Sequence, residues 1–435
     1  MVGAAAVLLT VAGATPAAAA SAPSVVTTRV SVSCNGTQAN SYAFEPAISG
    51  NGRYVAYFSD ASNLVRGDTN DRNDVFVYDR RTRCVERVSV TSAGRQVGRG
   101  GQQPAISDNG RYVVFASEAP DLVRGDTNAF ADIFVRDRAR DTNDRVSVTS
   151  GGRQQTGGGA ASPEISDNGR YVVYWSAATN LVPGDTNEEM DVFRYDRRTG
   201  RTERISVATD GTQGNARSGF PGGPDLSRDG RDVVFESEAS NLVPNDFNGN
   251  ALDVFLRDTK TGRTSLVSLA SDGSQGAGDS YWPSISDDGR FVTFNSDAAN
   301  LVPGDTNGTW DVFVRDLKRG VTTRVSVASD GTQGNDISYP SDISGNGRYV
   351  AFFSIAGTLV ANDTNGTWDI FVHDRYTRRT VRASVGSDGT QANGASQLPS
   401  IADKGHAVVY ESDATNLVRP DTNDNTDVLL SQLTR

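Results

Sequence analysis

The feature that most constrains this chain is a repeat of about 58 residues. The tripeptide Asp-Thr-Asn, or Asp-Phe-Asn in one copy, recurs at intervals of 58 to 61 residues. It starts at Asp68, Asp126, Asp185, Asp246, Asp305, Asp363 and Asp421. A second marker, Arg-Val-Ser-Val or a close variant, starts at Arg29, Arg87, Arg145, Arg204, Leu266, Arg324 and Arg382. Seven copies cover residues 28–435, which leaves no room there for a second domain.

Each copy predicts four short strands. Asn-Gly or Asp-Gly marks a tight turn between the first two strands in six copies, because that turn needs positive φ angles. A loop of about 14 residues, which contains the Asp-Thr-Asn marker, separates the second and third strands. No segment shows a sustained helical period. In the first full copy the predicted strands are 46–49, 54–59, 74–79 and 86–90.

Four antiparallel strands repeated seven times around an axis predict an all-β fold, a seven-bladed β-propeller. The chain opens with a lone fourth strand at 28–32, and its last copy stops after a third strand at 427–430. We therefore expect the N-terminal strand to join the last blade and close the ring, because an open ring leaves unpaired strand edges.

The repeat also carries a family resemblance. Residues 104–115 read Pro-Ala-Ile-Ser-Asp-Asn-Gly-Arg-Tyr-Val-Val-Phe, and Asp-Val-Phe-x-x-Asp follows the long loop in several copies. This pattern resembles the WD40-like (PD40) repeat of TolB-type propellers, and the resemblance covers all seven copies. It implies a propeller scaffold of the kind used in periplasmic adaptors and peptidases, and it does not imply one function. The additional domains of TolB and of the propeller peptidases have no counterpart in this sequence.

The first twenty residues are predicted to be a signal peptide. Residues 1–20 carry no charge, and an apolar stretch at 4–13 is followed by Ala18-Ala19-Ala20. Small residues at this spacing are typical of a signal peptidase site, so we expect cleavage before Ser21 and secretion to the extracellular or cell-envelope space. Residues 21–435 then form a single propeller domain, which we expect to be a monomer. The apolar run is too short to span a membrane.

Composition and motifs argue against several functions. The net charge of -11 has the wrong sign for a nucleic-acid partner. The only two histidines, His373 and His406, are expected on the surface, where neither has a second histidine nearby for a metal site. No Gly-x-Ser-x-Gly, His-Glu-x-x-His or phosphate-binding loop occurs. We therefore expect a binding protein rather than an enzyme.

Any binding site is expected on one face of the ring. The loops between second and third strands and the blade connectors emerge on the same side, the long-loop face. Aromatic side chains break the sevenfold pattern there and suit the stacking of sugar rings, with packing between blades as the alternative. The candidates are Tyr42, Phe44, Phe220, Tyr281, Trp282 and Tyr339 before first strands, and Trp310 and Trp368 in long loops.

The long loops also suggest a metal site. Asp-x-Asn-x-x-x-Asp recurs in them, and its carboxylate and amide oxygens are ligands suited to a structural Ca²⁺ ion. The alternative is an Asx turn, in which the same side chains accept local backbone N–H groups. The candidate ligands are Asp305, Asn307 and Asp311 in one copy, and Asp363, Asn365 and Asp369 in the next.

The two cysteines are expected to remain unpaired. Cys34 follows the N-terminal strand on the long-loop face, and Cys84 is expected in the turn before a fourth strand on the opposite face. A strand of this length separates the faces by roughly 15–20 Å. A disulfide needs Cα atoms within about 7 Å.

The sequence therefore predicts a secreted, non-catalytic propeller that recognises an extracellular glycan or a protein partner on its long-loop face. One alternative is a secreted polysaccharide hydrolase or lyase that uses acidic loop residues. The other is a TolB-like adaptor that binds an envelope protein.

Overall fold

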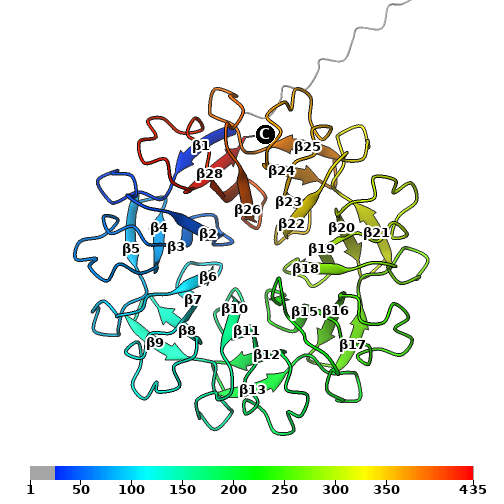
Figure 1. Ribbon diagram of the computed structural model, residues 1–435, viewed down its shortest axis with the longest axis horizontal. Helices are drawn as coiled ribbons and strands as arrows, with labels where there is room; N and C mark the ends of the chain where they lie inside the picture. The colour runs from blue at the N-terminus through cyan, green and yellow to red at the C-terminus, as the bar shows by residue number, and fades with distance from the viewer. Residues whose placement is uncertain (1–24, 435) are drawn as a thin grey trace, which may run out of the picture.

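The structure is a computed structural model that describes residues 25–434. These residues form seven four-stranded antiparallel sheets, arranged as blades around a ring (Figure 1). Strands are the only regular elements between residues 25 and 434, so this part of the chain has no helix that could cross a membrane. The predicted all-β, seven-bladed propeller is confirmed. The predicted signal peptide lies outside the described residues.

The blades follow one another along the chain, and each starts at the central channel and ends at the rim. Blades one to three contain β2 (Ala43–Ile48), β3 (Tyr54–Ser59), β4 (Asp74–Asp79), β5 (Cys84–Arg87), β6 (Gln102–Ile106), β7 (Tyr112–Ser117), β8 (Asp132–Asp137), β9 (Thr142–Arg145), β10 (Ala160–Ile165), β11 (Tyr171–Ser176), β12 (Asp191–Asp196) and β13 (Arg201–Arg204). Blades four and five contain β14 (Asp225–Leu226), β15 (Asp232–Ser237), β16 (Asp253–Asp258), β17 (Arg263–Leu266), β18 (Ser280–Ile285), β19 (Phe291–Ser296), β20 (Asp311–Asp316) and β21 (Val321–Arg324). Blade six contains β22 (Ser338–Ile343), β23 (Tyr349–Ser354), β24 (Asp369–Asp374) and β25 (Arg379–Arg382).

The seventh blade is built from both ends of the chain. It contains β26 (Ser396–Ile401), β27 (Ala407–Ser412), β28 (Asp427–Leu433) and β1 (Val25–Arg29). β1 pairs antiparallel with β28, from Val25 opposite Leu433 to Arg29 opposite Leu429. The predicted closure of the ring by the N-terminal strand is confirmed. We call the β1–β28 pair the seam.

Aromatic side chains fill the middle of most blades. A ring from the second strand packs on a phenylalanine from the third strand, with centroids 5.7 to 6.1 Å apart. The pairs are Tyr57–Phe76, Phe115–Phe134, Tyr174–Phe193, Phe235–Phe255, Phe294–Phe313 and Phe352–Phe371. These side chains are buried, so apolar burial in every blade supplies the main stabilisation of the ring.

The outer strands lie a few residues earlier than the sequence suggests. The pattern predicts strands at 86–90 and 28–32, whereas β5 is Cys84–Arg87 and β1 is Val25–Arg29. The reason is that only the arginine of Arg-Val-Ser-Val belongs to the strand. The serine turns inward: Ser89 Oγ accepts a hydrogen bond from the Val75 amide and donates one to Asp74.

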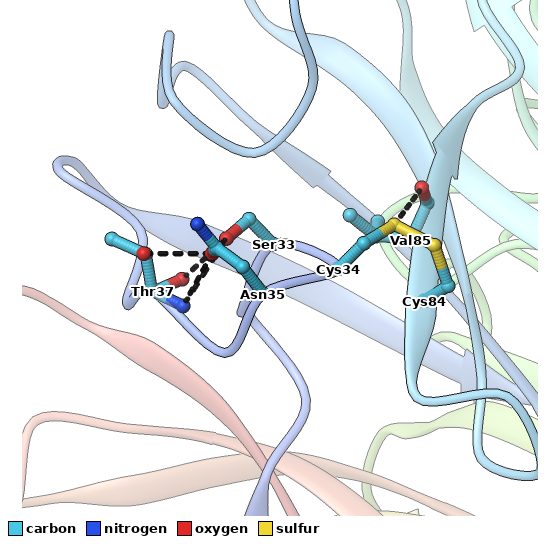
Figure 2. The surroundings of a disulfide bond; sticks show 6 residues. All are labelled: Ser33, Cys34, Asn35, Thr37, Cys84 and Val85. Atoms are coloured by element: carbon cyan, nitrogen blue, oxygen red, sulfur yellow. Dashed lines mark hydrogen bonds between the residues drawn. A yellow bond between two sulfur atoms is a disulfide. The ribbon is translucent and has the colours of Figure 1, made fainter.

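The expectation that the cysteines remain unpaired is wrong. Cys34 and Cys84 form a disulfide with Cα atoms 4.1 Å apart (Figure 2). Cys84 is the first residue of β5 rather than part of a distant turn. After β1 the chain forms a small hairpin, bridged at Val32 and Gln38, whose tip reaches the outer strand of the first blade. The two cysteines are therefore not separated by the length of a strand, because this hairpin lies against the side of the next blade.

Candidate functional site

A channel of about 470 Å³ runs through the centre of the ring and is lined by the innermost strands. These strands carry a β-bulge next to a proline, which shifts the register of their pairing with the second strand. The residue before the proline adopts a left-handed backbone conformation and lines the channel mouth on the long-loop face. In five blades this residue is Glu45, Gln103, Ser162, Trp282 or Leu398. The bulge is thus a shared element that presents a different side chain in each of these blades.

Several polar groups at the mouth are engaged by the backbone of a neighbouring blade. Glu411 accepts a hydrogen bond from the Glu45 amide at 3.1 Å, and Gln103 Oε1 accepts one from the Ser162 amide at 3.0 Å. The buried Glu236 accepts a hydrogen bond from the Trp282 amide of the next blade at 2.7 Å and another from the Gly222 amide of its own blade. Burial raises the pKa of Glu45 and of Glu236 to about 7. These contacts tie the blades together around the mouth.

Five of the eight predicted aromatic residues form one continuous group on blades five and six, which we call the aromatic belt. It consists of Tyr281, Trp282, Trp310, Tyr339 and Trp368. The ring centroids are 4.5 Å apart for Tyr281–Trp282 and 5.7 Å apart for Trp282–Tyr339. All five side chains are partly exposed, and Trp282 also lines the channel mouth. The first-strand aromatics and the two loop tryptophans thus form one surface.

The other three predicted aromatics lie outside the belt. Tyr42 stacks on Phe44 with centroids 5.7 Å apart on the first blade, and Phe44 packs on Phe58. Phe220 packs edge-on against Trp175 at 6.1 Å, at the junction of blades three and four. The sequence pattern does not single out Trp175, because this residue belongs to a second strand, β11, where aromatic residues are typical of the core.

The Asp-Thr-Asn loops hold an arginine between their carboxylates. Arg324 Nη1 lies 3.0 Å from Asp305 and 3.1 Å from Asp311, and Asn307 donates to Asp311 at 3.1 Å. The guanidinium therefore neutralises the carboxylates that calcium would need, and this arrangement favours ion pairing within the loop. Arg382 lies in the same way, at 3.0 Å from Asp363 and 3.1 Å from Asp369, with Asn365 donating to Asp369.

The fourth blade lacks this arginine, because Leu266 occupies its position. There Gln275 Nε2 lies 2.8 Å from oxygens of Asp246, Asn248 and Asp253. Burial raises the pKa of Asp253 to about 6. Among the described residues, no group of three or more His, Cys, Asp or Glu side chains is arranged to hold a metal ion. Calcium binding stays a prediction.

The channel interior is acidic, which the sequence analysis missed. Eight carboxylates line it: Glu45, Asp108, Glu164, Asp167, Asp225, Asp287, Asp342 and Asp403. Burial raises the pKa of Asp225 to about 7 and that of Asp342 to about 6. At the end away from the belt, Arg228 pairs with Asp167 at 2.9 Å. Two variable positions in Pro-x-Ile-Ser-x carry most of these acids, and this pattern could have identified them.

One histidine differs from its predicted surface position. His373 is buried, and its Nδ1 lies 2.9 Å from Thr380 Oγ1. Burial lowers the pKa of His373 to about 4, so its ring is neutral at physiological pH. His373 lies in the third strand, β24, and its partner Thr380 donates a hydrogen bond to the Val327 carbonyl in the hairpin of the preceding blade, so the histidine is buried at the contact between two blades.

Comparisons with known proteins agree on the fold. No family model and no curated protein matches the chain. Among solved structures, it is similar to oligogalacturonate lyase from Vibrio parahaemolyticus, with 11% identity over 94% of this chain and 97% of that chain and a TM-score of 0.56. The β-propeller domain of the Trilobed protease from Pyrococcus furiosus has 11% identity, covers 90% of this chain and 95% of its own, and gives a TM-score of 0.53. TolB from Acinetobacter baumannii gives 15% identity over 83% of this chain and 76% of that chain, with a TM-score of 0.41.

At such low identity the similarities to the lyase and to the Trilobed protease domain show the fold alone. The chain is a β-propeller protein with seven blades. The Pyrococcus furiosus domain has an open velcro topology, whereas this chain closes its last blade with β1. The PD40 assignment stays a prediction from the repeat pattern.

Proposed function

We propose that this protein is a secreted, non-catalytic propeller that binds glycans on its long-loop face through the aromatic belt. The belt is the observation that supports this proposal. It presents five partly exposed rings over two adjacent blades, where other blades have no such group. Flat apolar faces with polar groups nearby suit the stacking and hydrogen bonding of sugar rings. The Cys34–Cys84 disulfide supports an oxidising compartment outside the cytosol.

A hydrolase or lyase is the second candidate, because Glu45 at the mouth and the buried Glu236 behind Trp282 have pKa values near 7. Glu236, however, accepts hydrogen bonds from the amides of Gly222, Gly223 and Trp282. A carboxylate engaged in this way is poorly placed to exchange a proton with a substrate. Its contacts therefore favour a structural role and a non-catalytic protein.

A glycan array probed with residues 21–435 tests this proposal, in calcium and again in EDTA. We expect a glycan signal that Trp282→Ala weakens about tenfold or more, because central aromatic residues dominate such interfaces. Tyr376→Ala is the matched control, since this tyrosine is 84% exposed but lies in the turn after β24, outside the belt. The melting temperature of each variant shows whether it is folded.

The other outcomes separate the alternatives. A blank array in both buffers contradicts glycan binding and directs the search to a protein partner, as expected of a TolB-like adaptor. Turnover of a bound polysaccharide contradicts the non-catalytic part of the proposal. Loss of the signal in EDTA alone assigns a metal ion to the long loops.

A further inference from the structure

Neighbouring blades meet at the rim through one repeated contact. After each outer strand the chain forms a hairpin, and a serine or threonine in it accepts a hydrogen bond from a backbone amide in the outer strand of the next blade. Six junctions share this contact at 3.0 or 3.1 Å: Ser92–Asn143, Ser150–Thr202, Thr209–Thr264, Ser271–Thr322, Ser329–Thr380 and Ser387–Thr27.

The seventh junction is covalent. Cys34 occupies the hairpin position that serine or threonine fills elsewhere, and its sulfur lies 3.5 Å from the Val85 carbonyl oxygen. It is bonded to Cys84, the residue before Val85 (Figure 2). The disulfide therefore replaces a hydroxyl contact at one junction of the ring.

This junction adjoins the seam. Cys34 follows β1 by five residues, so the disulfide anchors the chain that leaves β1 to the outer strand of the first blade. The seam itself is non-covalent. Five residue pairs join β1 to β28, and Arg29 pairs with Asp427 at 2.6 Å and with Asp421 at 3.0 Å. In other blades the fourth strand is joined to the third by a short turn, which β1 lacks.

The disulfide is open to small reagents. Cys34 is exposed at the hairpin tip, and Cys84 is partly exposed. A dithiol can attack an exposed disulfide through its thiolate. The protein disulfide then takes up two electrons and two protons to give two thiols, and the dithiol becomes a cyclic disulfide.

We propose that the Cys34–Cys84 disulfide is a redox-sensitive clasp on the seam. In the oxidised protein the clasp fixes the chain that leaves β1 to the outer strand of the first blade, which limits how far β1 can move away from β28. After reduction by a dithiol, β1 is held by non-covalent contacts alone, and it separates from β28 more often. These contacts include the strand pairing, the Arg29 ion pairs and the hydrogen bond between Thr27 and Ser387. In a reducing environment the ring thus opens at the seventh blade, between β1 and β28.

Hydrogen exchange of the full chain, with and without dithiothreitol, tests this proposal. We expect reduction to speed the exchange of the amides of β28 about tenfold or more, because these amides lose protection when β1 leaves. The amides of β20 in the fifth blade serve as the internal control and should change little. Equal exchange of β28 before and after reduction overturns the proposal, as does a uniform increase in all blades.

A double variant tests the same point without a reductant. Cys34→Ser with Cys84→Arg gives the first blade the residues found at other junctions, such as Ser150 and Arg201. It can fold with the repeated hydrogen bond in place of the disulfide. We expect its β28 amides to exchange as fast as those of the reduced protein, with no further change in dithiothreitol. Exchange as slow as in the oxidised protein overturns the clasp.

Discussion

At the scale of single residues, the two repeated markers are partners. The arginine of Arg-Val-Ser-Val lies between the two carboxylates of the Asp-Thr-Asn loop in six blades. The markers look independent in the sequence, because within a copy they are about 19 residues apart and come together only across paired strands. One signal was present: the fourth copy has lost the arginine, at Leu266, and its acidic loop is also altered.

Replacing one of these arginines should destabilise the fold. Arg324 is 9% exposed, and its partners Asp305 and Asp311 are 5% and 0% exposed. Arg324→Ala leaves two buried carboxylates without a cation, so we expect the free energy of unfolding to fall by about 3 kcal/mol. Urea unfolding followed by circular dichroism measures this change.

Arg319→Ala is the matched control in the same blade. Arg319 is 74% exposed and lies 4.0 Å from Asp316, so its removal should cost less than about 0.5 kcal/mol. Equal stability of the two variants would show that the loop carboxylates have another counter-charge, such as a bound calcium ion.

At the scale of elements, the sequence located most strands but not the hairpins after the outer strands. The turns and alternating apolar residues correctly predict β3 and β4. The hairpins have no apolar pattern of their own, and they are held by hydroxyl contacts with the next blade. For this reason the disulfide and the burial of His373 could not be predicted from strand geometry.

Removal of β1 tests the importance of the seam. Without residues 25–33, β28 becomes an unpaired edge with buried apolar residues such as Leu429 and Leu430 next to it. We expect a lower melting temperature and a broader transition in scanning calorimetry. A chain that starts at Val25 is the control and should melt like the longer protein. An unchanged melt without β1 would contradict the role of the seam.

At the scale of the whole molecule, the sequence predicted the ring, its seven blades and its closure, because the repeat alone determines them. It did not predict the acidic channel. Most carboxylates that line the channel come from two repeat positions in several blades, and only the closed ring brings Glu164, Asp225 and Asp342 together. The aromatic belt was predicted residue by residue, but its continuity depends on how blades five and six pack.

The carboxylates of the channel make the free energy of unfolding depend on pH. Burial raises the pKa of Asp225 and Asp167 to about 7 and that of Asp403 to about 6, above the ordinary value of 3.8. The native state therefore binds protons that the unfolded chain does not, and stability should rise as the pH falls from about 8 to about 5. A second group acts in the opposite direction. Hydrogen bonding to Arg170 lowers the pKa of Asp196 to about 2, so the stability that the charged Asp196 contributes is lost as the pH falls from about 4 to about 2.

The melting temperature, measured between pH 2 and pH 9, should therefore be highest at about pH 5. Asp225→Asn combined with Asp342→Asn should flatten the slope between pH 5 and pH 8, because it removes two titrating groups while keeping oxygens for the Ile285 and Ile401 amides. A melting temperature that rises from pH 5 to pH 8 in the unaltered protein would show that the channel carboxylates are charged in the native state.

The clasp also determines how the molecule would bear mechanical load. Val25 and Leu433 are paired at the same end of the seam, so tension between the chain ends would peel the residue pairs apart one after another. Once the seam has opened, the force would pass from Cys34 to Cys84 through the disulfide and bypass residues 35–83. Residues 35–83, which contain β2, β3 and β4, would then be shielded from extension while the rest of the chain unravels.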